Sequence, residues 1–357
     1  MDKKFKNILK DYQKRISKEI EIFFDKKITK AKISFQKDDL RLIKEFSLRP
    51  AKRIRAILVI YGYSLAGGKK FKEILKTSAF IELIHNFLLI HDDIIDQDEF
   101  RRGKKTIHSF CQQSCFSKNN EEKKHYGFSM GMVYGDLVNS LGYEILSNSN
   151  FSDKYKIRAI NKLNEAVCLT GSGQMFEMRL REKMGRGKKI SENEIIAIYG
   201  NKTAFYSFLA PLQIGALLAG VDGGILKKIE NFAMFLGVAF QIQDDIQEIF
   251  SSEKEIGKPL CSDIIEGQPN LLIVKALENK NLGKKLKEYI GNKNINKEDI
   301  EEIRNIMKET GSYDYCLRVK ENFIKKAEGV LNSEGEFPRA EKQFLINLAN
   351  YVSQRKN

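Results

Sequence analysis

Two acidic stretches, each inside an apolar segment, decide how this chain folds. Residues 85–96 read HNFLLIHDDIID, and residues 238–248 read VAFQIQDDIQE. The apolar residues before each acidic group predict helices that are half-buried. Adjacent carboxylates in such surroundings repel one another, and an unpaired buried charge is disfavoured. We therefore expect a cation to lie between these acidic side chains.

The spacing of the acidic residues indicates which of them act together. Residues four apart share one face of an α-helix, so Asp92 and Asp96 project together, as do Asp244 and Glu248. Mg²⁺ takes oxygen ligands and usually binds one or two carboxylates plus a substrate phosphate. Two such helices facing each other across a cavity could hold several Mg²⁺ ions and a diphosphate. The alternative, two solvated acidic faces, is disfavoured by the apolar residues before each cluster.

Basic residues accompany both acidic stretches. Arginine binds phosphate oxygens through paired hydrogen bonds, and lysine acts as a compact charge. Each of these residues taken singly is more often a surface cation, so only the set predicts an anion site. The set comprises Lys52, Arg53, Arg55, His85, Arg101, Arg102 and Lys104 around the first stretch, and Lys202, Thr203 and Lys258 near the second.

Composition limits the class of protein. The net charge of +14 favours anions in general, but acidic residues are mixed throughout and no nucleic-acid module is present. No uninterrupted apolar run approaches the roughly 18 residues of a membrane span, and the charged start lacks a secretory signal. The five cysteines show neither zinc spacing nor the density of a disulfide scaffold. We expect a cytoplasmic protein that binds no nucleic acid and makes at most peripheral membrane contact.

Apolar periodicity predicts helix almost throughout, and no segment alternates long enough to predict a strand. Without a Pro-rich or Gly/Ser-rich linker, we expect one all-α domain over residues 1–357. A capping box at Ser191 and Glu194 predicts a helix start, Gly311 a helix end, and Pro50, Pro269 and Pro338 first-turn positions. The expected helices are 3–30, 36–47, 50–66, 69–96, 125–148, 154–183, 191–219, 223–250, 269–290, 297–310, 313–332 and 338–354, with loops at 97–107, 117–124, 184–190 and 251–267.

Taken in order, these motifs resemble the trans-isoprenyl diphosphate synthase (polyprenyl synthetase) family over about residues 45–280. The matching motifs are Lys52-Arg53-Ile54-Arg55 (GGKRxRP), His85, Asp92–Asp96 with Arg101-Arg102-Gly103 (first aspartate-rich motif), Gly173-Gln174-x-x-Glu177 (GQxxD), Lys202-Thr203 (KT) and Phe240–Asp245 (second aspartate-rich motif). The resemblance implies a single large helical bundle around a central substrate cavity. The chain departs from the family pattern at Pro50-Ala51, Ala56, Glu177, Glu248 and Gln268.

The resemblance also implies a Mg²⁺-dependent 1'-4 condensation of isopentenyl diphosphate with an allylic diphosphate. The Mg²⁺ ligands would be Asp92, Asp96 and Asp244, supported by Asp93, Asp245 and Glu248. Isopentenyl diphosphate would be bound by Lys52, Arg55, His85 and Arg102, and the allylic diphosphate by Arg101, Lys202, Thr203, Gln241 and Lys258. Asp92, Asp96, Asp244, Lys202, Thr203 and Gln241 would form the catalytic set. The family also suggests a homodimer.

Product length is predicted from Phe87, five positions before Asp92 and about 7.5 Å away along a helix axis. An aromatic residue there, with no insertion in the first acidic motif, resembles short-chain, archaeal-type geranylgeranyl synthases. We expect C15 to C20 products with geranylgeranyl diphosphate preferred, and Leu88 and Ile84 are the next candidates for this role.

Other readings remain. A farnesyl or longer-chain product is one, and a catalytically weak or silent partner subunit of a heteromeric synthase is another, which the retained acidic clusters oppose. A terpene cyclase would share the fold, but its second motif differs from Asp244-Asp245-x-x-Glu248. A basic scaffold for lipid or nucleic acid would bind anions without any diphosphate turnover.

Overall fold

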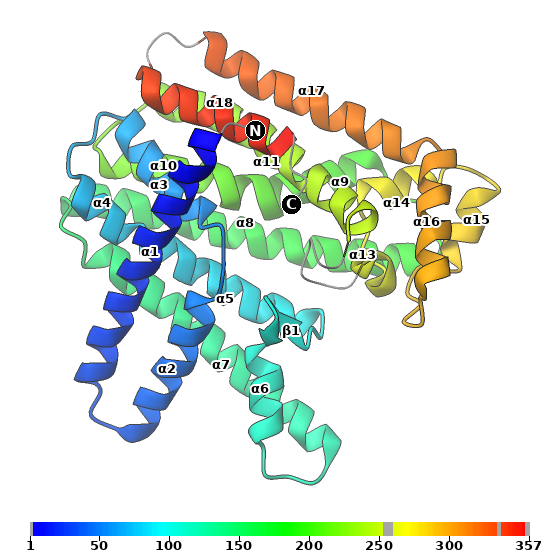
Figure 1. The fold of residues 1–357 in the computed structure, drawn as a ribbon, viewed down its shortest axis with the longest axis horizontal. Helices are drawn as coiled ribbons and strands as arrows, with labels where there is room; N and C mark the ends of the chain where they lie inside the picture. Colours follow the sequence, from blue (N-terminus) through cyan, green and yellow to red (C-terminus); the bar gives the residue numbers. More distant parts are fainter. Residues whose placement is uncertain (1–2, 253–259, 334–336, 354–357) are drawn as a thin grey trace. The chain divides into compact units, whose positions relative to one another are not determined.

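The computed structural model describes residues 3–252, 260–333 and 337–353, and these are almost entirely helical (Figure 1). The chain forms two compact units. The amino-terminal unit comprises Asp2–Ile160 and Ile214–Gly220, and the carboxy-terminal unit comprises Asn161–Gln213 and Val221–Asn357. The all-α class is confirmed, whereas the single domain over residues 1–357 stays a prediction.

The elements of each unit follow chain order, and two helices cross from one unit into the other. The crossing helices are α8 (Asp153–Gly185) and α10 (Ala210–Leu218). The amino-terminal unit contains α1 (Lys3–Lys30), α2 (Ser34–Leu48), α3 (Ile54–Leu65), α4 (Phe71–Thr77), α5 (Ala79–Ile95), β1 (Phe100–Arg101), β2 (Lys104–Lys105), α6 (Ile107–Ser114) and α7 (Asn120–Ser147). The carboxy-terminal unit contains α9 (Glu192–Ile198), the π-helix η1 (Tyr199–Leu209), α11 (Gly224–Phe250), α13 (Ser262–Glu266), α14 (Leu271–Ala276), α15 (Leu282–Lys287), α16 (Lys297–Glu309), α17 (Ser312–Ser333) and α18 (Arg339–Ser353).

Helix α5 is the centre of the amino-terminal unit, where it packs against α7 and also contacts α1, α2 and α3. Its residues Phe80 to Ile84 are fully or almost fully buried, and each large apolar side chain among them contributes roughly 1.5–3 kcal/mol. Gly135 lets α7 approach the end of α5, because a Cβ atom there would lie 2.2 Å from Nε2 of His91. The first acidic cluster therefore lies at the end of a rigidly packed helix.

Helix α11 is the centre of the carboxy-terminal unit, where it contacts η1, α17 and α18. Figure 1 shows α17 in orange and α18 in red running side by side. Gly237 allows close packing against η1, because a Cβ atom there would lie 2.4 Å from Cα of Ala204. The second acidic cluster is thereby held next to the segment that carries Lys202 and Thr203.

Most predicted helices are confirmed within a few residues, as are the two expected helix signals. Ser191 and Glu194 form the capping box of α9, and Gly311 has φ +74° beyond the end of α16. Proline was the less reliable signal. Pro50 does not begin a helix, since α3 starts at Ile54 after Arg53 in the left-handed region, and Pro269 precedes the Asn270 cap of α14.

Several predicted segments are wrong in detail because non-local packing overrides periodicity. The expected loop 97–107 contains the β1–β2 hairpin and the first residue of α6, and the expected loop 251–267 contains α13. The expected helix 69–96 divides at Ser78, and 269–290 divides into α14 and α15. The expected helix 191–219 is interrupted by η1, whose i→i+5 hydrogen bonds have no signature in apolar spacing.

Among the described residues, one stretch, Phe71–Ile95, is long and apolar enough to cross a membrane by length and composition alone. It consists of α4 and α5, and 67% of its most apolar window is buried inside the protein. Core helices of globular proteins have the same properties.

Candidate active site

Four arginines surround His85 in the amino-terminal unit. Burial and the positive charges of Arg55, Arg102, Arg101 and Arg53 hold the pKa of His85 well below its usual range. Burial, together with the neighbouring arginines, also lowers the pKa of Arg102 to about 10. Within the described part of the chain, Nη1 of Arg102 is buried and makes no hydrogen bond. A partly buried group of cations that oppose one another's charge is typical of a site that binds an anion.

Arg53 has a structural role that the sequence did not reveal. Its Nη1 donates to Oε2 of Glu82 at 3.2 Å, and its Nη2 donates to the carbonyl oxygen of Ser47 at 2.6 Å. The other carboxylate oxygen of Glu82 accepts from the backbone N–H of Ala56 at 3.2 Å, in the first turn of α3. Arg53 therefore fastens the basic segment to α5 and is not a candidate phosphate ligand.

Glu82 was missed by sequence reasoning. The arginine and glutamate side chains are 1% and 3% exposed, so this is a buried ion pair. The available signal was a lone acidic residue among the apolar residues 79–84, three positions before His85. An acid in such surroundings predicts a buried cationic partner.

The first acidic cluster presents its residues in two different ways. Asp93 is fully buried and is ion-paired with Nε of Arg101, whose Nη2 lies 3.3 Å from Asp98 and 3.7 Å from Asp92. Burial raises the pKa of Asp93 to about 7, although Arg101 acts in the opposite direction. Asp92 and Asp96 are only partly buried. They remain the better candidates for metal ligands, while Asp93 is engaged inside the protein.

The hairpin turn separates Arg101 from its neighbour Arg102. Arg101 ends β1, and Arg102 and Gly103 follow with φ of 55° and 75°. Arg101 pairs with the acidic cluster, whereas Arg102 lies among the arginines around His85. The two adjacent side chains therefore have different surroundings.

The second acidic cluster, like the first, contains a buried aspartate next to a partly buried one. Asp245 is buried and accepts hydrogen bonds from the hydroxyl of Tyr199 and from Nε2 of Gln241, the latter at 2.9 Å. Burial raises the pKa of Asp245 well above its usual range. Asp244 is partly buried. It is therefore the candidate metal ligand of this cluster.

Glu248 does not occupy the position expected from its spacing to Asp244. Glu248 is 6% exposed, and its carboxylate accepts from the hydroxyl of Ser262 and from the backbone N–H of Asp263, the latter at 2.6 Å. It therefore caps the start of α13. Residues four apart on a helix are offset by about 40°, which is enough to direct Glu248 toward a neighbouring segment.

The π-helix η1 carries Lys202 and Thr203. Extended π-helical segments are rare and often mark functional sites. Nζ of Lys202 lies 2.5 Å from Oε2 of Glu177 on α8, and the hydroxyl of Thr203 donates to Oε1 of Gln241 at 2.7 Å. Three motifs that are distant in sequence therefore meet within the carboxy-terminal unit.

The remaining predicted site residues differ in their exposure. Lys52 is exposed, and its carbonyl oxygen accepts from Gln13 at 3.2 Å. Phe87 is partly buried and packs edge-on against His91 with ring centroids 4.9 Å apart. Ile84 is fully buried and Leu88 partly buried, and Lys258 lies outside the described residues. The central cavity stays a prediction.

In each unit, taken by itself, the partly buried carboxylates are of the kind that binds Mg²⁺ together with substrate oxygens. Among the residues described, no three His, Cys, Asp or Glu side chains converge to hold a metal ion by themselves. Mg²⁺ does not require such a cage, because it keeps several waters and binds phosphate oxygens. The partly buried Asp92, Asp96 and Asp244 supply suitable donors.

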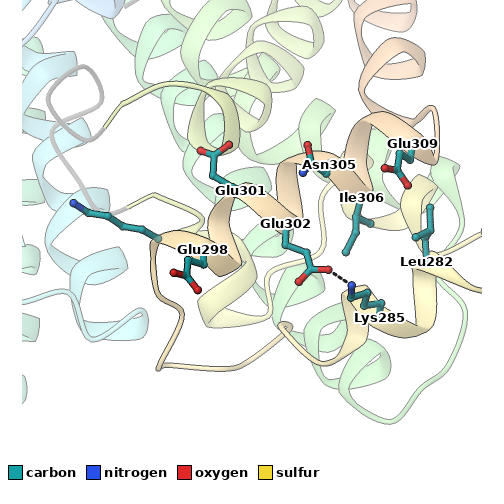
Figure 2. A pocket seen from close by; sticks show the side chains of 9 residues that line it. Leu282, Lys285, Glu298, Glu301, Glu302, Asn305, Ile306 and Glu309 are labelled. Carbon is teal, nitrogen blue, oxygen red and sulfur yellow. Dashed lines mark ion pairs between the residues drawn. The ribbon is translucent and has the colours of Figure 1, made fainter.

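A surface pocket in the carboxy-terminal unit is a separate feature. Figure 2 shows it between α15 and α16, with an ion pair between Lys285 and Glu302. Its volume is about 600 Å³, and its lining includes Glu298, Glu301 and Glu309. It contains none of the predicted site residues, and its acidic lining does not suit a diphosphate.

Comparison with known proteins identifies the class of this enzyme. The polyprenyl synthetase family model matches residues 40–307. The geranylgeranyl diphosphate synthase of Sulfolobus acidocaldarius is 30% identical over 309 residues, which cover 85% of this chain and 87% of the relative. The geranylgeranyl pyrophosphate synthase of Geoglobus acetivorans is 30% identical over 304 residues, which cover 85% and 86%.

Solved structures agree in fold. The geranylgeranyl pyrophosphate synthase from Corynebacterium glutamicum, complexed with isoprenyl diphosphate and magnesium, superposes with a TM-score of 0.88 at 24% identity, covering 98% of this chain and 99% of that one. The helical architecture and the matched motifs define a prenyltransferase. The chain belongs to the polyprenyl synthetase family and is of the short-chain trans-isoprenyl diphosphate synthase type, as the sequence motifs predicted.

Proposed function

We propose that this prenyltransferase condenses isopentenyl diphosphate with an allylic diphosphate in a Mg²⁺-dependent 1'-4 reaction, with geranylgeranyl diphosphate as the preferred product. The observation that carries the proposal is the group of arginines around His85, next to the first acidic cluster. The names of the relatives from Sulfolobus and Geoglobus support the choice of product.

Isopentenyl diphosphate is assigned to the basic group of the amino-terminal unit. Arg55, Arg102 and His85, with Lys52, supply donors for its phosphate oxygens. Arg53 and Glu82 contribute indirectly, because they hold the start of α3 against α5. A neutral His85 donates a hydrogen bond without adding charge to a crowded cationic group.

The allylic diphosphate is assigned to Lys202, Thr203 and Gln241, with Arg101 and Lys258. Asp92, Asp96 and Asp244 would hold Mg²⁺, which when bound neutralises charge on the diphosphate leaving group. As the allylic C–O bond breaks, Lys202 and Arg101 stabilise the negative charge that develops on the leaving oxygen. The double bond of isopentenyl diphosphate then forms the new C–C bond, and the released diphosphate accepts the proton that is lost.

Product length is assigned to Phe87, whose packing on His91 gives its ring a defined position. Phe87→Ala is expected to extend products to C25 or longer without loss of the first condensation, because it opens space for a longer tail. Leu88→Ala is the matched comparison on the next residue of α5. Unchanged products from a folded, active Phe87→Ala enzyme would return Phe87 to a packing role.

A homodimer is supported by exposed apolar side chains on α7. Met132, Val133 and Leu137 are 50%, 64% and 38% exposed, and the last two lie four residues apart on one face. Sedimentation of the wild type and of Val133→Lys tests this proposal. A monomeric wild type would overturn it.

The cytoplasmic location remains a prediction, which cell fractionation tests.

The deciding experiment uses the purified chain alone. It is incubated with isopentenyl diphosphate, Mg²⁺ and each allylic starter in turn, and the products are resolved by chain length. Chelation should abolish turnover. Absence of turnover with every starter would contradict the proposal and favour a partner subunit.

A further inference from the structure

Tyr199 connects three elements of the carboxy-terminal unit through one hydroxyl group. It is the first residue of η1 and is 3% exposed. Its hydroxyl donates to Oδ2 of Asp245 on α11 and accepts from the backbone N–H of Leu271, the first residue of α14, at 2.8 Å. None of the predicted catalytic or binding roles includes this residue.

The hydrogen bonds continue from Asp245 to the residues assigned to the allylic diphosphate. Nε2 of Gln241 donates to the other oxygen of Asp245 at 2.9 Å, and Oε1 of Gln241 accepts from the hydroxyl of Thr203 at 2.7 Å. The amide of Gln241 has one orientation in this arrangement, because its nitrogen faces the carboxylate and its oxygen faces the hydroxyl. The direction of the Thr203 hydroxyl follows from that of Gln241.

We propose that Tyr199 is a positioning residue of the second acidic cluster: it holds Asp245 inside the protein and thereby fixes the side chains of Gln241 and Thr203, two residues assigned to the allylic diphosphate. The inference rests on the proposed function for the identity of that ligand. It also divides the cluster, since Asp244 then binds metal and Asp245 orients its neighbours. The position of Tyr199 is suited to this role because the ring is buried and the hydroxyl has a fixed partner on each side.

Tyr199→Phe is the direct test, because it removes the hydroxyl and leaves the ring in the core. We expect kcat to fall by about tenfold and the Michaelis constant for the allylic diphosphate to rise, with that for isopentenyl diphosphate unchanged. Tyr289→Phe is the matched control. Its hydroxyl also donates to a carboxylate, Oε2 of Glu302 at 2.7 Å, but outside the acidic cluster. Equal effects on both substrates, or no effect, would overturn the proposal.

A double-mutant cycle tests whether Tyr199 acts through Asp245. Asp245→Asn replaces one carboxylate oxygen by an amide nitrogen and leaves the outer acid, Asp244, in place, so it should lower kcat far less than Asp244→Asn does. The combined Tyr199→Phe and Asp245→Asn enzyme should lose no more activity than the worse single variant. Multiplicative losses, or an Asp245→Asn loss as large as that of Asp244→Asn, would contradict the proposal. The comparison of Asp245→Asn with Asp244→Asn stands even if Tyr199→Phe folds poorly.

Calorimetry separates this inference from the proposed function. Inorganic diphosphate is titrated into each variant with Mg²⁺ present, so no turnover is needed. Weaker binding by Tyr199→Phe than by wild type and Tyr289→Phe supports the positioning role, even if the wild type condenses no substrate. Equal binding by all three proteins would overturn it. Failure of the wild type to turn over any starter would instead count against the proposed function alone.

Discussion

The two acidic clusters have nearly the same sequence but bury their middle acid against different partners. Asp93 in the amino-terminal unit is held by the cation Arg101, which lies on a two-stranded hairpin. Asp245 in the carboxy-terminal unit is held by the neutral donors Tyr199 and Gln241, on a π-helix and on α11 itself. A repeated motif therefore specifies where a carboxylate stands but does not specify how its burial is compensated.

The cations around the two clusters also differ between the two units. Arginines gather around His85 beside the first cluster, and burial together with their mutual repulsion lowers the pKa of Arg102. In the second unit, Lys202 is already paired with Glu177 at 2.5 Å. The first cluster thus lies in the more positive surroundings.

The largest expected effect concerns the outer acids, by which we mean the partly buried aspartates Asp92 and Asp244. Asp92→Asn and Asp244→Asn should each lower kcat by a factor on the order of 10³, because each removes a carboxylate assigned to Mg²⁺. The rates are measured at saturating substrate and Mg²⁺. If either variant kept near wild-type activity, the shared role of the two clusters in metal binding would be wrong.

A smaller effect is expected at Glu82, which like Asp93 is buried against an arginine. Glu82→Gln leaves Arg53 buried without its counter-charge and should lower the free energy of unfolding by about 3 kcal/mol. Urea denaturation measures the change. Glu21→Gln is the control, because Glu21 pairs with the exposed Lys18 and lies 4.0 Å from Lys44 at the surface, and this change should leave stability nearly unchanged. Equal stability of both variants would show that the pair is not energetically important.

Arg101 and Arg102 are adjacent in the hairpin but should affect different substrates. Arg102→Ala should raise the Michaelis constant for isopentenyl diphosphate about tenfold, since this side chain lies in the basic group. Arg101→Ala should act mainly on the allylic substrate, because it also releases Asp93. Steady-state kinetics with each substrate varied in turn measures both. Identical effects on the two substrates would contradict the division.

The smallest effect concerns Glu194, a surface carboxylate that contrasts with both buried acids. Hydrogen bonds from Lys183 and from Ser191 lower its pKa to about 2, whereas burial raises that of Asp93. A depressed pKa in the folded state stabilises the protein above the ordinary value near 4.5, and this contribution is lost as pH falls toward 2. We expect about 1 kcal/mol.

Thermal unfolding of wild type and Glu194→Gln between pH 6 and pH 2.5 tests this expectation. The difference in stability between them should shrink as the pH falls. A constant difference would mean that the capping box, rather than the charge, accounts for the effect of Glu194.

The sequence by itself determined the helical class, most helix positions and the order of the motifs. Apolar periodicity and local signals such as the Ser191 capping box depend on neighbouring residues only, so they can be read along the chain. The two acidic clusters were located in the same way, whereas the role of Asp92 and Asp244 as metal ligands stays a prediction. The family of the chain was identified because six motifs follow one another in the order that the family has.

Only the tertiary structure decided which acids face inward and what holds them. Tyr199 and Asp245 are 46 residues apart, and Arg53 and Glu82 are 29 apart, so no local pattern connects them. The π-helix and the turn of Glu248 toward α13 likewise depend on packing between distant segments. Burial makes an unpaired carboxylate costly, but several donors satisfy it equally well, and the choice among them is made by the fold.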